Sequence, residues 1–119
     1  MDKVNLADKF ARFADQWSPK IVGAVDDYEI KLVKLQGEFV WHHHAEVDEM
    51  FLVCKGSMII HLRDRDVNLN EGEFFVVPRG VEHLPEAAEE CSVLLFERKG
   101  TVNTGDVRNA RTVAQLQHL

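Results

Sequence analysis

The stretch that decides the fold reads GEFVWHHHAEVDEMFLVCKG and runs from Gly37 to Gly56. It opens on a Gly-Glu break and closes on a Lys-Gly-Ser turn signal. Two short segments of β character, residues 39–44 and 50–54, lie between these points. The second, MFLVC, is apolar throughout, which is typical of a buried strand. The first ends in three consecutive histidines, so a structural pattern and candidate ligands occur together.

The alternation of side chains along a strand separates these three histidines. His42 and His44 point to one face of the sheet, and His43 points to the other. Two imidazoles on the same strand face can bind one metal ion. Glu49 would face the opposite side of an unbroken strand, but a turn through residues 45–48 lets the next strand run back antiparallel beside the first. We therefore expect the carboxylate of Glu49 close to the two imidazoles.

A second motif lies between Gly72 and His83. Residues 74–77 (FFVV) form an apolar β segment. Pro78 and Gly80 then predict a tight turn, because proline presets φ and glycine permits positive φ. The histidine that follows this turn can reach the same interior position from a neighbouring strand. Three neutral imidazoles and one carboxylate suit Mn, Fe, Co, Ni, Cu or Zn, and suit Ca or Mg poorly.

The two stretches resemble the two motifs of the cupins. The first cupin motif has His-x-His, a Glu a few residues later and a closing Gly, as in residues 37–56. The second has a Gly, a Pro-x-Gly turn and a His, as in residues 72–83. Two features depart from the family pattern. Four residues separate Gly37 from His42 where the family spacing is five, and Ala87 replaces an Asn often found after the second-motif histidine.

The resemblance is to a small single-domain cupin of the cupin-2 type, in the RmlC-like superfamily. It implies an all-β fold, an antiparallel double-stranded β-helix or jelly-roll barrel of six to eight strands. It also implies that His42, His44, Glu49 and His83 bind one divalent transition metal ion per chain, with Fe, Mn, Ni and Zn as candidates. Three or four protein ligands leave positions open for water or substrate, as catalytic sites do. A metal-free alternative stays open, because buried histidines can pair with a carboxylate in a polar network.

Short β segments separated by turns fill the rest of the middle of the chain. Further strands are expected at residues 20–25, 28–36, 58–62, 67–69 and 92–97. Strands this short at such regular intervals favour a sandwich or barrel. We therefore assign residues 20–100 to one barrel domain.

The two flanks carry weaker patterns. The spacing of Leu6, Phe10, Phe13 and Trp17 predicts a short helix within residues 1–19, with Asn5 as the N-cap and Ser18-Pro19 as the end. Its apolar stripe would pack on the barrel wall, with a dimer contact as the alternative. Residues 101–119 are expected to be a tail on the barrel or on a partner, with either a helical turn or a frayed end at residues 112–119.

Several other residues are expected to lie outside the site. Lys34 has the parity of His42, but a bulge at Gly37 would turn it away from the interior. Surface positions are expected for the remaining candidates, which are Trp41, His43, His61, Arg79, His118 and an acidic loop with Glu86, Glu89 and Glu90.

Composition limits the class of protein. The chain has 119 residues, of which 45% are hydrophobic and 29% charged, as in an ordinary globular domain. Its formal net charge is -6, so it has no basic stripe for nucleic acid or an anionic membrane. No apolar run approaches the roughly 20 residues that span a bilayer. The start of the chain lacks a signal-peptide core, which predicts a cytoplasmic protein with Cys54 and Cys91 as free thiols.

Fold does not fix function, and three classes remain open. The first is a metal-dependent enzyme on a small polar substrate, of the dioxygenase or isomerase type. The second is a non-catalytic module that binds a small molecule or a metal. The third is a metal-free structural cupin that acts through a dimer surface. No residue is assigned as general acid or base. A homodimer is expected, with Trp17 and Trp41 supplying apolar contact surface.

Overall fold

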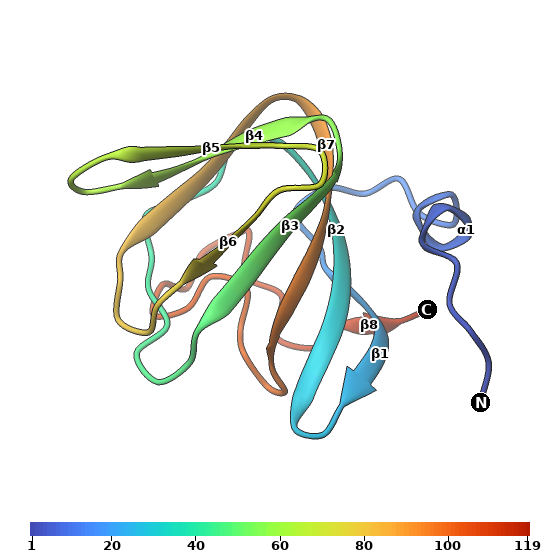
Figure 1. The fold of residues 1–119 in the computed structure, drawn as a ribbon. Coiled ribbons are helices and arrows are strands. Elements are labelled where there is room, and N and C mark those ends of the chain that lie inside the picture. The colour runs from blue at the N-terminus through green and yellow to red at the C-terminus, as the bar shows by residue number, and fades with distance from the viewer.

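The computed structural model describes residues 1–119 and contains one helix and eight strands (Figure 1). The helix α1 spans Leu6–Phe10. The strands are β1 (Lys20–Val25), β2 (Tyr28–Glu38), β3 (Glu49–Lys55), β4 (Ser57–Leu62), β5 (Asp66–Asn70), β6 (Phe74–Val77), β7 (His83–Arg98) and β8 (Gln117–His118). The predicted all-β barrel is therefore confirmed, and the strand expected at residues 74–77 has the predicted bounds.

The long strand β7 organises the barrel. Figure 1 shows it bending over the barrel, so that its first part lies beside β4 and its later part beside β2 and β3. All of these pairings are antiparallel. The sequence predicts a strand only at residues 92–97, with an acidic loop before it. This prediction is wrong, because Glu86, Glu89 and Glu90 all lie within β7. Glu and Pro disfavour strands locally, but pairing with β4 outweighs that preference.

The barrel core consists of side chains that alternate inward along β2, β3 and β7. In the β3–β7 ladder, Phe51 lies opposite Leu95 on β7, and Val53 lies opposite Val93. On the other side of β7, Val33 of β2 also faces Val93. These residues belong to one cluster of 14 buried apolar residues. Because the same period of two continues toward one end of the barrel, it also directs polar side chains inward there.

The N-terminal segment differs from its prediction. The helix ends at Phe10 and buries none of its residues, so it is shorter than the expected stripe. Trp17 has a left-handed backbone with φ 60° and lies almost fully buried. Its indole Nε1 donates to the carbonyl of Gln36 at 2.9 Å, and its ring stacks on Phe39 at 4.7 Å. Burial of this ring against the barrel outweighs the helical spacing, because helix propensity is a weak preference.

The segment that carries the three histidines is also different. Residues 39–44 do not form the predicted strand, and only His42 makes an isolated bridge, to His83. Gly37, with φ 78°, lies at a shift in the β2–β7 register, which ends the regular ladder. As a result, β3 pairs with β6 and β7 instead of with the histidine segment. The predicted bulge at Gly37 is confirmed, and Lys34 accordingly donates to the Phe13 carbonyl outside the barrel.

The C-terminal tail ends in β8, which pairs in parallel with β1. The alternative of a helical turn at residues 112–119 is therefore wrong.

Two of the polar residues expected at the surface make ion pairs. The side chain of His61 is a quarter exposed. Its Nε2 lies 2.6 Å from Oε1 of Glu86 and its Nδ1 lies 2.7 Å from Oδ1 of Asp66, and these contacts raise the pKa of His61. Arg79, more than half exposed, pairs with Asp48. No helix here has the length and apolarity needed to cross a membrane.

The two tryptophans that were expected to supply a dimer contact are not freely exposed. Trp17 is buried, and the half-buried ring of Trp41 lies under the guanidinium of Arg63, 3.7 Å from its centroid. The large apolar side chains that are exposed include Phe74 and Val76 of β6. The homodimer itself stays a prediction.

Candidate metal centre

Four buried side chains meet inside the barrel. Each of His42, His44, Glu49 and His83 offers one ligand atom, and these atoms all lie within 4.8 Å of one another. None of the four side chains belongs to an exposed residue, and His83 is fully buried. The structure thus brings together all four residues that the sequence singled out.

Different elements position these groups. His42 and His44 follow the end of β2, Glu49 is the first residue of β3, and His83 is the first residue of β7. Backbone hydrogen bonds in both directions between His42 and His83, at 3.1 and 2.9 Å, fix the two main chains side by side. Their ring centroids are 4.2 Å apart. Although residues 39–44 are not a ladder strand, their side chains still alternate, so His42 and His44 are buried while His43 is partly exposed.

Hydrogen bonds orient the imidazoles. Nδ1 of His42 lies 2.9 Å from the carbonyl oxygen of Val40, and Nδ1 of His83 lies 2.9 Å from that of Val81. A carbonyl oxygen only accepts, so each Nδ1 carries a proton, and the neutral form of each ring has its lone pair on Nε2. This arrangement, with the second ring nitrogen held by a carbonyl, is typical of metal-ligating histidines.

The contacts inside the cluster fit a cation. Oε1 of Glu49 lies 3.3 Å from Nε2 of His83 and 3.3 Å from Nε2 of His44. Nε2 of His44 is buried without any hydrogen-bond partner. Because buried polar atoms are almost always paired, the donor set has the chemistry that a divalent ion would satisfy.

Burial and neighbouring groups together set the charge states of His42 and Glu49. Burial, together with the neighbouring His83, lowers the pKa of His42 to about 4, so this imidazole is neutral at pH 7, as metal binding requires. Burial by itself disfavours the carboxylate form of Glu49. Contacts with the imidazoles of His44 and His83 nevertheless hold the pKa of Glu49 well below its ordinary value. The site therefore combines a neutral imidazole at His42 with a carboxylate at Glu49.

A buried ion pair that the sequence analysis did not predict lies beside the centre. Lys31 of β2 lies 2.8 Å from Oε1 of Glu97 on β7, and both side chains are almost fully buried. Glu97 faces Glu49 across the β3–β7 ladder. Burial and the adjacent charge of Glu49 raise the pKa of Glu97. The signal was present, because Glu97 continues the period of two set by Val93 and Leu95, which predicts an inward side chain.

The C-terminal tail covers the outer side of the histidine segment. His43 points outward as predicted, and its backbone N–H donates to Asp106 at 2.9 Å. Gly105 has φ 58°, and a Cβ placed there would collide with the carbonyl oxygen of His43 and lie 2.9 Å from the carbonyl carbon. The tail can approach the segment this closely only because this residue is glycine.

Replacing Gly105 with alanine is expected to lower the free energy of unfolding by about 1–3 kcal/mol more than the same change at Gly100. Both glycines have positive φ, but a Cβ at Gly100 meets no atom within 4 Å, so the comparison isolates the steric clash. Urea denaturation of the two variants measures the difference. Equal losses of stability would mean that the tail does not depend on this close approach.

Comparison with known proteins supports the same family. The model of the cupin domain matches residues 31–97, which include all four cluster residues. A cupin-2 domain containing protein from Shewanella frigidimarina is 47% identical, with a TM-score of 0.80 over 81% of this chain and 94% of that chain. Protein YdbB of Bacillus subtilis is 32% identical over 79 residues, which are 66% of this chain and 70% of the relative.

One further relative has a named activity. A 3-hydroxyanthranilate 3,4-dioxygenase of Xanthomonas euvesicatoria is 32% identical over 69 residues. The match covers 55% of this chain but only 39% of that enzyme, so the chain spans well under half of its length. The matched domain model, the barrel and the similar solved structure lead to one assignment: the chain belongs to the cupin domain family.

Proposed function

We propose that this cupin binds one divalent transition metal ion through His42, His44, Glu49 and His83 and acts as a metal-dependent enzyme on a small molecule. The observation that carries the proposal is the meeting of four buried ligand atoms within 4.8 Å. The unpartnered Nε2 of His44 supports it, because a metal would satisfy that atom. Iron, manganese, nickel and zinc all suit such a donor set.

Within this class we favour a dioxygenase. The support is the 32% identity to 3-hydroxyanthranilate 3,4-dioxygenase over 69 residues, although that match covers 39% of the relative. Iron at a site of this kind supplies Lewis acidity and one-electron chemistry. The residues of the chain then have separate roles. Val40 and Val81 hold the His42 and His83 rings by their carbonyls, and Glu97 lies beside the Glu49 carboxylate.

A sugar-phosphate isomerase has less support. Such an enzyme needs cationic side chains that meet the phosphate, since phosphate recognition relies on Arg and Lys. The cavity beside the cluster has no Arg or Lys in its wall. Lys31 is buried nearby, but its ammonium group is already paired with Glu97.

The first test is the metal content of untagged protein purified without added metal, measured by plasma mass spectrometry. We expect about one ion per chain. Iron-loaded protein should then consume oxygen in an electrode assay with a panel of small phenols, and zinc-loaded protein should not. Metal binding without oxygen consumption would support a non-catalytic binding module. A chain that takes up no metal on soaking would contradict the proposal and support the metal-free structural class.

A further inference from the structure

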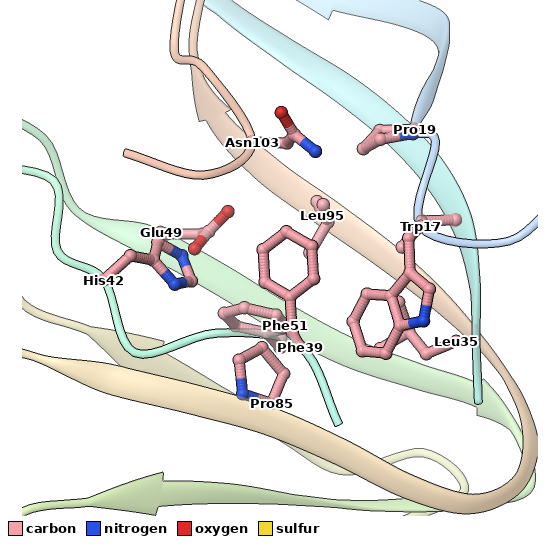
Figure 2. A pocket seen from close by; sticks show the side chains of 11 residues that line it. Trp17, Pro19, Leu35, Phe39, His42, Glu49, Phe51, Pro85, Leu95 and Asn103 are labelled. Atoms are coloured by element: carbon pink, nitrogen blue, oxygen red, sulfur yellow. The ribbon is translucent and has the colours of Figure 1, made fainter. Parts of the chain in front are cut away.

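A cavity lies directly beside the four-residue cluster. Figure 2 shows His42 and Glu49 on one side of it and Trp17 and Leu35 on the other, with the ring of Phe39 between them. The space free of atoms, including its opening to solvent, is about 370 Å³. About 30 Å³ of it can hold the centre of a water molecule, so the cavity is narrow. A molecule bound there would have one end at the proposed metal ion.

The wall of this cavity is chemically uniform. Apart from His42 and Glu49, nearly all its side chains are hydrocarbon or aromatic, and Leu95, Val33 and Phe51 are examples. A buried hydroxyl or charge that enters such a wall without a hydrogen-bond partner loses its hydration and gains nothing in return. The wall therefore favours the hydrocarbon groups of a ligand over its hydroxyl groups.

The two polar side chains in the rest of the wall, Trp17 and Asn103, already make hydrogen bonds within the protein. The indole N–H of Trp17 donates to the Gln36 carbonyl at 2.9 Å. The amide of Asn103 donates to the Arg111 carbonyl and accepts from the backbone N–H of Val113, both at 2.8 Å. Of these groups, only the second N–H of the Asn103 amide is left to meet a ligand. A ligand with several hydroxyl groups would leave most of them unpaired.

The charge of the wall also disfavours an anionic ligand. The wall contains no cationic side chain, so it has no partner for a phosphate or sulfate. The guanidinium of Arg111 lies 5.1 Å from the ring of Trp17 and 5.9 Å from that of Phe39, but Arg111 is not part of the wall. Glu49 adds negative charge at the inner end, which disfavours a second anion unless a cation lies between them.

From these observations we infer that the cavity binds a small, neutral, mostly apolar molecule that presents a single polar atom to the metal ion at His42, His44, Glu49 and His83. The inference rests on the proposed metal binding and specifies its ligand class. The carbon skeleton lies among Trp17, Phe39 and Leu95, and the polar atom is an alcohol or phenol oxygen or a thiol sulfur. The narrow cavity limits the skeleton to a few carbon atoms or one flat ring.

The test uses two thiols that share the metal-binding atom and differ in the rest of the molecule. Butane-1-thiol is apolar, and 3-sulfanylpropane-1,2-diol has almost the same size with two hydroxyl groups. Each is titrated without oxygen into the Co²⁺-loaded full chain, and the visible absorption of cobalt reports binding. We expect butane-1-thiol to bind about tenfold or more tightly, since the diol would bury two unpaired hydroxyls.

A pair of matched variants locates the effect in the cavity. Val33 and Val53 both face Val93 across the sheet and both are buried, but only Val33 lines the cavity. Val33→Leu should weaken butane-1-thiol binding severalfold and reduce the preference over the diol. Val53→Leu should leave both unchanged, with circular dichroism checking the fold of each variant.

The outcomes separate the two proposals. If Co²⁺ binds and the two thiols bind equally, or the diol binds more tightly, the ligand class is wrong and the metal site stands. If no cobalt spectrum develops in the folded protein, both the metal site and the ligand class are wrong. A preference for butane-1-thiol that Val33→Leu reduces and Val53→Leu preserves would support the inference.

Discussion

The double substitution His42→Ala and His44→Ala is expected to abolish metal binding while the barrel stays folded. These two residues supply two of the four ligand atoms within 4.8 Å. Loss of a group that merely orients a ligand lowers metal affinity about 10–100-fold, so loss of two ligands should exceed 100-fold. Neither residue lies in a strand of the barrel, so we expect the two substitutions to leave the sheet folded.

The matched control for this experiment is His43→Ala. The chain offers a third imidazole between the other two, and its side chain points to Asp106 on the outer surface. Titration with Zn²⁺ or Co²⁺ by calorimetry measures affinity for all variants, and circular dichroism reports the fold. Full metal occupancy in the double variant would show that the ligand assignment is wrong. A similar loss of affinity in His43→Ala would point to a general disturbance of the segment.

The second large effect concerns the buried pair of Lys31 and Glu97. Breaking such a pair by removing one partner costs about 3–5 kcal/mol, because the other charge is left in the interior. Glu97→Leu should cost more than Lys31→Met. Once Glu97 is gone, the ammonium of Lys31 keeps only the Thr101 carbonyl at 3.5 Å. Glu97 without Lys31 can take up a proton, because burial and Glu49 raise its pKa.

Urea denaturation at pH 7 of the two single variants and the double variant measures this coupling. The double variant should lose less stability than Glu97→Leu alone, because no unpaired charge remains. The exposed control is the pair of Arg63 and Glu82, whose side chains are 57% and 51% exposed. Glu82→Ala should cost no more than about 1 kcal/mol. Additive losses at Lys31 and Glu97 would contradict the coupling.

Much of the candidate site was predictable, because its signals are local. A tight turn at Pro78 and Gly80 and an apolar strand at residues 74–77 are short-range patterns, and the structure has both. The parity of His42 and His44 needs only three residues of extended chain. It holds even though the expected ladder strand does not form, because the isolated bridge to His83 keeps the backbone extended there.

The features that sequence reading missed depend on distant partners. The first part of β7 forms because β4 pairs with it, although Pro85 and the glutamates around it disfavour a strand. Trp17 is part of a helical spacing, but the chain buries it on Phe39 with a left-handed backbone. In both cases a local preference worth a fraction of a kcal/mol per residue is outweighed by burial or pairing worth more.

By itself, the sequence determined the all-β class and singled out the four residues of the centre, because strand periodicity and turn chemistry indicate which side chains face inward and because the two motifs resemble those of cupins. Only the tertiary structure decided what surrounds them. The contact of Glu97 with Lys31 and Glu49 joins three strands, and the apolar cavity joins Trp17 to Leu95. Such contacts arise from the bulges and register of the whole barrel, which set distances between residues far apart in the chain.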